Sequence, residues 1–131
     1  MSTQIDYHLQ AGMQLLARGE FFEAHEEWEI PWVNMTGDKR SFWQAMIQLS
    51  VGAFHYQRNN MTGCYNLWKK ALIRCQNLRK KNSTVEPHLT IELLKLLESS
   101  LRQLDSGKNP LPEIQAFAEL CCEQKPFNSQ K

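Results

Sequence analysis

Hydrophobic residues recur every three or four positions along most of the chain, which is the spacing of amphipathic helices. No segment shows the sustained alternation of polar and apolar residues that marks a half-buried strand. Pro31 lacks a backbone N–H, so we expect the second helix to end there, near Ile30. The pattern predicts six helices, at about 4–17, 21–30, 39–57, 61–80, 88–104 and 112–124.

The third of these helices differs from the others because it is apolar almost all round. Its segment FWQAMIQLSVGAFHY, residues 42–56, leaves little room for a solvent-facing side. Such a helix is typical of the centre of a bundle. We therefore expect an all-α fold, a compact bundle of about six helices with the third helix central.

A faint internal repeat runs through the first two thirds of the chain. Residues 17–29, ARGEFFEAHEEWE, align with residues 57–69, QRNNMTGCYNLWK, at a separation of 40 positions. Each copy places a tight turn between two helices, as in tetratricopeptide-like units, although those repeat every ~34 residues. Two copies are too few for a solenoid, so we expect a bundle built on two helical hairpins.

The segment AHEEWE, residues 24–29, resembles the start of a zinc-hydrolase motif. The second His of H-E-x-x-H is missing, however, and Glu29 stands in its place. At about 100° per residue, His25 and Glu29 share an arc with the apolar residues of the helix. Glu26 points about a quarter-turn away, so its position is poor for a general base.

The central helix carries a matching polar strip. Gln44, Gln48 and His55 are spaced four and then seven residues apart, so they lie on one line. A buried polar group without a partner costs ~1–3 kcal/mol, and each of these side chains therefore needs one. We expect this strip to face His25 and Glu29 of the second helix.

Two interpretations of these facing strips stay open. In the first, His25, Glu29 and His55 bind a divalent metal such as zinc and leave one position open, while Gln48 orients a ligand or water. In the second, the same side chains form a hydrogen-bond network that fixes the helix packing without any chemistry. A pocket for a small molecule or a peptide is a further alternative.

Length and composition favour a single domain over residues 1–131. Fifteen Lys and Arg balance 14 Asp and Glu, which argues against a dedicated nucleic-acid or membrane-surface protein. No apolar stretch approaches the ~20 residues of a membrane span, and no secretory signal is visible at the start. The four cysteines lack C-x-x-C spacing, so we expect a reduced, cytoplasmic protein.

Two surfaces could bind partners. The basic run at 69–81 fits either RNA, an acidic partner or a simple solvated face, and the five Glu of residues 20–29 could complement it within the molecule or in a dimer. Leu94 and Leu101 widen the leucine stripe of the fifth helix enough for a second subunit. A protein or peptide partner and a homo-oligomer therefore both stay open.

Three segments carry a resemblance to a known family. These are residues 21–32, FFEAHEEWEIPW, residues 42–49, FWQAMIQL, and residues 55–63, HYQRNNMTG. Over about residues 7–80 the chain resembles domain-of-unknown-function family 309, with a helical extension at about 86–124. The positions that match its motifs are His25, Glu26, Glu29, Trp32, Gln44, Gln48, His55 and Arg58.

The resemblance implies a compact helical bundle and, by the family's label, a metal-dependent hydrolase. It implies no substrate, and whether the chain is an enzyme stays open. Pro31 departs from the family pattern, which continues the helix to the Trp, so the packing of Trp32 over the His–Glu pair is in question. The alternative is a non-enzymatic helical-hairpin module that binds a protein or peptide.

Overall fold

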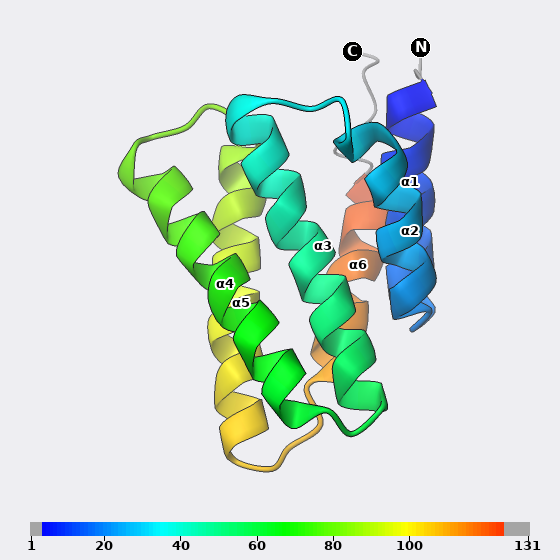
Figure 1. Cartoon of the computed structure of the whole chain (residues 1–131), viewed down its shortest axis with the longest axis vertical. Helices are drawn as coiled ribbons and strands as arrows, with labels where there is room; N and C mark the ends of the chain where they lie inside the picture. Colours follow the sequence, from blue (N-terminus) through cyan, green and yellow to red (C-terminus); the bar gives the residue numbers. More distant parts are fainter. Residues whose placement is uncertain (1–3, 125–131) are drawn as a thin grey trace.

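The computed structural model describes residues 4–124 and shows six helices joined by short turns (Figure 1). Within these residues there is no strand, so the all-α prediction is confirmed. All six predicted helices agree with the observed ones to within two residues at either end. The bounds are α1 Gln4–Ala17, α2 Phe21–Trp32, α3 Gly37–Gln57, α4 Met61–Lys80, α5 Pro87–Asp105 and α6 Leu111–Gln124.

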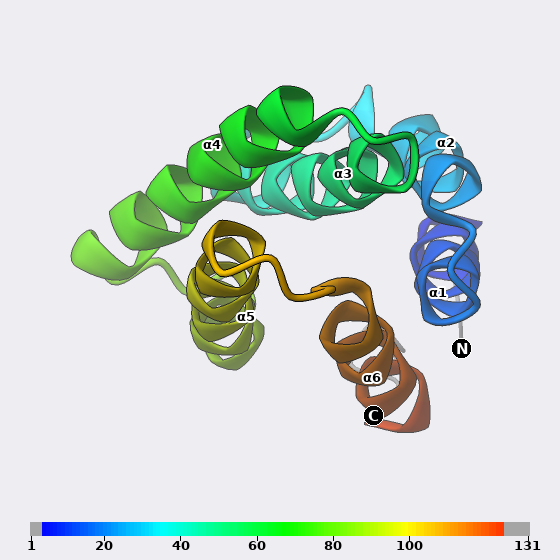
Figure 2. The same cartoon turned by 90° about the horizontal axis from the view of Figure 1, so that it is seen from below.

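The helices form two layers of three. Seen along the helices, α2, α3 and α4 make one layer, and α1, α6 and α5 make the other (Figure 2). Each helix packs on the next in sequence, and α1 also packs on α6, so the helices close into a ring. The expected central position of α3 is confirmed, because it lies between α2 and α4 in its layer.

The core of the bundle is filled by large side chains. Three of the four tryptophans are fully buried there, and the rings of Trp28 and Trp43 lie 5.5 Å apart. Burying aromatic side chains of this size is a major source of stability in a small domain. The other large, fully buried side chains are Trp68, Phe21, Phe42, Met13, Leu16, Met46, Leu49, Leu93, Leu97 and Ile114.

The two hairpins α1–α2 and α3–α4 repeat the same contact. The Trp28 indole N–H donates to the carbonyl oxygen of Leu9 at 3.0 Å, and the Trp68 indole N–H donates to the carbonyl oxygen of Leu49 at 3.0 Å. Leu49 and Trp68 stand 40 positions after Leu9 and Trp28, which is the period of the sequence repeat. The structure thus contains two equivalent hairpins, consistent with the tetratricopeptide-like description.

The turns within these hairpins are equivalent as well. Gly19 and Asn59 both take positive φ angles, of 81° and 61°. After each of them, a backbone N–H reaches back to the carbonyl five residues earlier: Glu20 to Leu15 at 2.9 Å and Asn60 to His55 at 2.8 Å. This is the Schellman ending of a helix, in which a glycine or asparagine takes the left-handed position.

The predicted end of the second helix is wrong, because α2 continues through Pro31 to Trp32. Pro31 lies in the last turn, where its missing N–H removes one hydrogen bond and its buried ring contributes to the core. The helix closes with a hydrogen bond from the Val33 N–H to the Glu29 carbonyl at 3.4 Å. The two extra residues carry Trp32 toward the start of α3.

Candidate functional site

The His–Glu pair of α2 is only loosely joined. His25 is buried, and its Nδ1 lies 2.5 Å from the carbonyl oxygen of Phe22, to which it donates. Its Nε2 is 3.8 Å from the Glu29 carboxylate, beyond hydrogen-bond distance. The side chain of Glu29 is 52% exposed, so the helix wheel placed His25 correctly and Glu29 too far inward.

His55 lies beside the turn between α3 and α4 and contacts Asn60 of that turn. Its Nδ1 is 3.5 Å from Nδ2 of Asn60. Aromatic rings connect it to His25: the Phe54 ring lies 6.1 Å from His55 and 4.9 Å from Phe22, which in turn lies 4.7 Å from His25. The two strips thus meet through apolar rings.

The proposed hydrogen-bond network between the strips does not form within residues 4–124. No hydrogen bond links His25 or Glu29 to Gln48 or His55, because His25 is satisfied by its own helix and Phe22 and Phe54 occupy the junction. Gln48 is buried, and its Oε1 has no partner. This acceptor was expected to be paired, and its burial carries a cost of ~1–3 kcal/mol.

The three predicted metal ligands are not gathered into one group. Among the described residues, no three His, Cys, Asp or Glu side chains are placed so that they could hold a metal ion. His25 and Glu29 are one turn apart on α2, while His55 is in the last turn of α3 beside Asn60. Metal binding by this set therefore has no support from the geometry.

A polar cavity of about 370 Å³ opens where the end of α2, the start of α3 and the middle of α4 meet. It contains two of the predicted site residues, Trp32 and Gln44. Arg58, another predicted residue, is exposed over the Phe54 ring, 5.5 Å from its centre, and does not line this cavity. The cavity is lined by Trp32, Gly37, Arg40, Ser41, Gln44 and Arg74.

Arg40 is held rigidly at this cavity. Its guanidinium stacks on the Trp32 ring, 3.6 Å from the ring centre, and donates to the carbonyl oxygens of Trp32 and Met35 at 3.2 and 3.3 Å. In return, the Trp32 indole N–H donates to the Arg40 carbonyl at 3.1 Å. Trp32 therefore packs against Arg40, which answers the question that Pro31 raised about its packing over the His–Glu pair.

Arg74 enters the cavity from α4. It donates to the Ser41 hydroxyl at 3.3 Å. Neither Arg74 nor Arg40 forms an ion pair with any carboxylate of residues 4–124, and no Asp or Glu lines the cavity. Two guanidinium groups without acidic partners make the site electropositive, and guanidinium is the preferred donor for carboxylate and phosphate groups.

Sequence reasoning missed Arg40 and assigned Arg74 only to a general basic run. The one signal for Arg40 was its place in the first turn of α3, eight residues after Trp32. Arg74 faces α3 because it shares a side of α4 with buried Ala71 and Leu78. Without the packing of three helices, nothing in the sequence singles out this pair.

A second cavity, of about 430 Å³, lies at the junction of α4 and α5. Arg79 is its only charged lining residue, and it contains none of the predicted site residues. Its lining combines apolar side chains with small hydroxyl and amide groups. These are Leu78, Arg79, Asn82, Ser83, Thr84, Pro87, Thr90 and Ile91.

The thiols offer no reactive alternative. Burial raises the pKa of Cys64, Cys75 and Cys121 to about 12, so all three stay protonated near neutral pH. Burial also raises the pKa of Cys122. The cysteines behave as small apolar residues in the core or packed against it.

No helix among the described residues is both long and apolar enough to cross a membrane.

No curated protein and no solved structure matches the chain significantly. The model of a domain of unknown function, DUF309, matches residues 9–67, from α1 into α4 and short of the predicted limit near residue 80. The resemblance to this family that the sequence motifs indicated is therefore confirmed over these residues.

Proposed function

We propose that this chain is a binding module whose cavity at Trp32, Arg40 and Arg74 takes a carboxylate or phosphate group of a ligand. The observation that carries the proposal is the pair of guanidinium groups that face one cavity without an acidic partner. Arg40 is already fixed by two carbonyl oxygens and an indole ring, so ligand binding costs little side-chain entropy.

The chemistry of the lining favours binding over catalysis. The cavity presents guanidinium, hydroxyl and amide groups, with no carboxylate, imidazole or thiol to transfer a proton. A volume of about 370 Å³ falls at the lower end of ligand pockets, which suits a small organic acid or the acidic end of a larger ligand. The metal-dependent hydrolase that the family label implies gains no support here.

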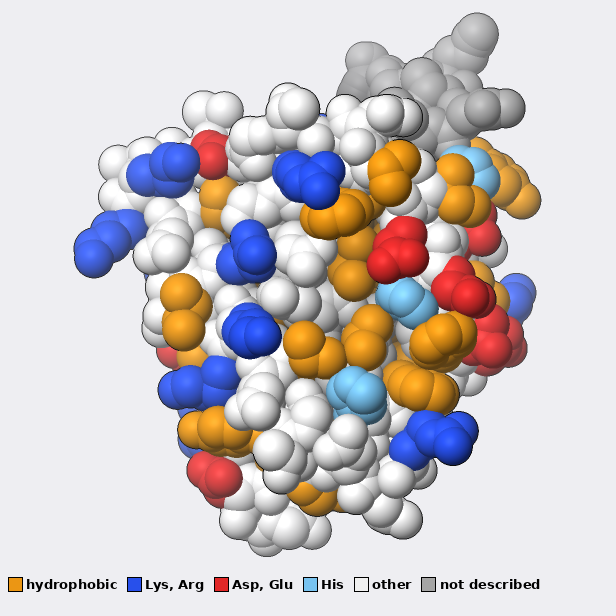
Figure 3. Space-filling view, viewed as in Figure 1, with side chains coloured by type: hydrophobic (Ala, Val, Ile, Leu, Met, Phe, Trp, Pro, Cys, Tyr) orange, Lys and Arg blue, Asp and Glu red, His pale blue; other side chains and the backbone are white. Residues whose placement is uncertain are grey.

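The face of the molecule that carries the cavity favours a protein as the source of the anionic group. Phe22 is 39% exposed and packs on half-buried Phe54 on the same side of α2 and α3. On the face formed by α2, α3 and α4, hydrophobic and histidine side chains lie between the charged edges (Figure 3). This combination supports the peptide- or protein-binding alternative, with the cavity as its charged anchor.

Calorimetric titration with inorganic phosphate and with citrate tests the proposal. We expect saturable binding to the wild-type chain, weakened by about fivefold or more in Arg74→Gln and Arg40→Gln, because each removes a charge-assisted hydrogen-bond donor. Arg102→Gln changes an exposed arginine of α5 and should leave binding unchanged. Equal binding by all four proteins would show that the cavity is not the anion site.

A further inference from the structure

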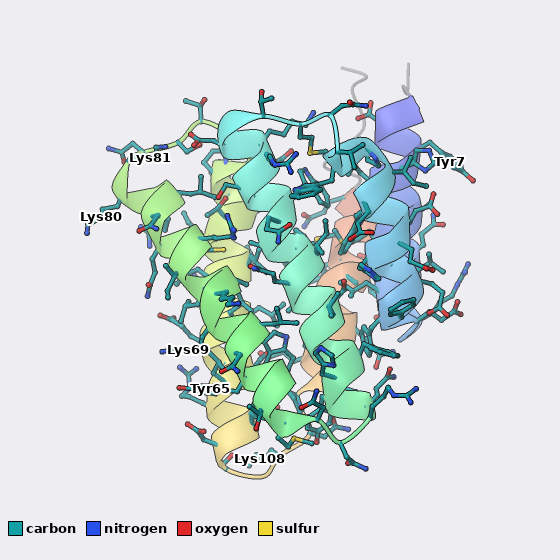
Figure 4. All side chains as sticks on the ribbon, viewed as in Figure 1. Tyr7, Tyr65, Lys69, Lys80, Lys81 and Lys108 are labelled. Carbon is teal, nitrogen blue, oxygen red and sulfur yellow. The ribbon has the colours of Figure 1, made fainter. Side chains whose placement is uncertain are left out.

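The face formed by α2, α3 and α4, called here the α2–α4 face, carries opposite charges at its two edges. α4 contains five Lys and Arg and no acidic residue, whereas α2 contains four Glu and no Lys or Arg. Figure 3 shows Lys and Arg side chains gathered over α4 and acidic side chains gathered over α2. Lys69 and Lys80 project from the outer edge of α4 and extend the basic edge sideways (Figure 4).

These two charged edges do not neutralise each other within one molecule. The ion pairs of residues 4–124 join His8 to Glu27, His25 to Glu29 and Lys81 to Asp38, and none links α2 to α4. The helix α3 lies between them and keeps them apart. Of the two alternatives for pairing the acidic and basic segments, the one within a single molecule is therefore not seen among residues 4–124, and pairing in a dimer remains.

We propose that the α2–α4 face binds a second copy of this chain in a symmetric dimer. A two-fold axis parallel to α3, in the plane of this face, places α2 of each copy over α4 of the other. Such an interface is self-complementary, because each acidic edge meets a basic edge and the arrangement closes at two subunits. This inference rests on the proposed function, since the partner's acidic α2 supplies the carboxylate for the cavity.

The levels of the charges along the helices agree with this axis. Trp32 of α2 and Arg74 of α4 line the same cavity, and α2 and α4 run in the same direction because both are antiparallel to α3. At ~1.5 Å per residue, Glu29 lies ~4.5 Å before Trp32 and Lys70 ~6 Å before Arg74. Rotation about an axis parallel to α3 preserves these levels, so Glu29 of one copy meets Lys70 and Arg74 of the other.

The centre of the α2–α4 face is suited to close contact. Between Arg40 and His55, α3 carries no charged residue. Its half-buried Val51 and Phe54 lie in this uncharged stretch, and the exposed Phe22 of α2 adjoins Phe54. Contacts between apolar side chains in the middle, with charged pairs at the rim, are the usual anatomy of a specific interface.

The area of this face is also sufficient. With 21 residues, α3 is ~32 Å long, and three helices spaced ~8–10 Å apart span ~20 Å between the outer axes. The projected area of ~600 Å² excludes the flanks of the side chains, and a standard interface buries ~800 Å² of each partner. The chain exposes 7203 Å² in total, so such a dimer hides about a tenth of it.

Sedimentation equilibrium at several protein concentrations tests the dimer through a charge swap. We expect the wild-type chain to form dimers, and Glu29→Arg and Arg74→Glu each to weaken dimerisation by about tenfold or more, because like charges then face each other twice. Mixing the two variants restores association, since both contacts in the mixed dimer again join opposite charges. Glu119→Lys, an exposed change on α6 in the other layer, should leave dimerisation unchanged.

Three outcomes overturn this inference. A wild-type chain that stays monomeric at every concentration excludes the dimer, while phosphate binding still tests the proposed function separately. Dimers that neither single variant weakens lie on another surface. Association that continues beyond two subunits excludes the two-fold axis, because a head-to-tail contact of α2 on α4 does not close. Circular dichroism of each variant confirms that the helices are intact.

Discussion

Glu86 is under conformational and electrostatic strain at the start of α5. It takes the left-handed conformation, with φ of 43°, which costs a residue with a side chain ~1–2 kcal/mol. Burial raises the pKa of its carboxyl group, and the charge of Lys39 partly opposes that shift. Its backbone carbonyl still accepts hydrogen bonds from Thr90, so the strain lies in the side chain and the backbone angle.

The raised pKa gives a signed pH dependence. In the folded chain, Glu86 holds its proton more strongly than in the unfolded chain, so its contribution to stability is most favourable below the ordinary pKa of ~4.3 and declines as pH rises through the folded pKa. Glu86→Gln should therefore raise the melting temperature at pH 7, with the gain vanishing near pH ~3.5 where both side chains are neutral.

Glu86→Gly separates the backbone contribution from the charge. Since glycine tolerates a positive φ, this variant should be more stable than the wild type by about 1 kcal/mol at both pH values, in addition to the charge effect at pH 7. Urea unfolding at pH 3.5 and pH 7 measures all three proteins. A lower stability of Glu86→Gln at pH 7 would mean that the carboxylate is stabilised where it lies.

At the scale of single residues, the sequence predicted which polar side chains are buried better than it predicted their hydrogen-bond partners. The helix wheel placed His25 and Gln48 inside, and both are buried. It also placed Glu29 inside, although a position at the border of the arc lets a long side chain turn toward solvent. The helix wheel could not predict the hydrogen-bond partners of these side chains, because His25 bonds to a carbonyl of its own helix.

At the scale of elements, the two hairpins depend on the same close contact between a helix and a tryptophan. A Cβ atom on Gly12 would lie 2.2 Å from Nε1 of Trp28, and one on Gly52 would lie 2.4 Å from Nε1 of Trp68. Glycine is required at both positions because the indole N–H bonds the backbone of the facing helix. Both copies of the repeat thus contain the same glycine–tryptophan contact and the same type of turn after it.

Gly12→Ala and Gly52→Ala should each destabilise the fold by about 1–3 kcal/mol, because the added methyl group displaces a buried indole ring. Alanine is otherwise the better helix former, so a gain of up to ~1 kcal/mol would be expected if space were available. Chemical unfolding provides the measurement, with Gln14→Ala as an exposed control on α1. A stabilising effect of either glycine substitution would contradict the described packing.

Helix bounds were predictable because hydrophobic spacing and turn residues agree along most of the chain. The end of α2 was not, since proline normally stops a helix and only its place in the final turn lets Trp32 continue the helix. That local difference has a large effect. Trp32 ends α2 beside Arg40, so the site that forms around it is a cationic cavity and not the expected His–Glu pocket.

At the scale of the whole molecule, the site arises where three helices converge. Trp32, Arg40 and Arg74 come from α2, α3 and α4, and only the packing of α3 between its neighbours brings them to one cavity. A pattern along one helix cannot reveal such a set. The central place of α3 was predictable from its apolar surface, whereas the cavity beside its first turn depends on side chains that extend from both flanking helices.

The Trp32 indole N–H offers the most direct test of the account, because Trp32 lines the cavity while Trp28, Trp43 and Trp68 are buried. In ¹H–¹⁵N spectra recorded during titration with inorganic phosphate, we predict a saturable shift of the Trp32 indole resonance in the wild-type chain and in Arg102→Gln, and its loss in Arg74→Gln. A Trp32 resonance that stays fixed, or that shifts equally in Arg74→Gln, would contradict the assignment of this cavity as an anion site.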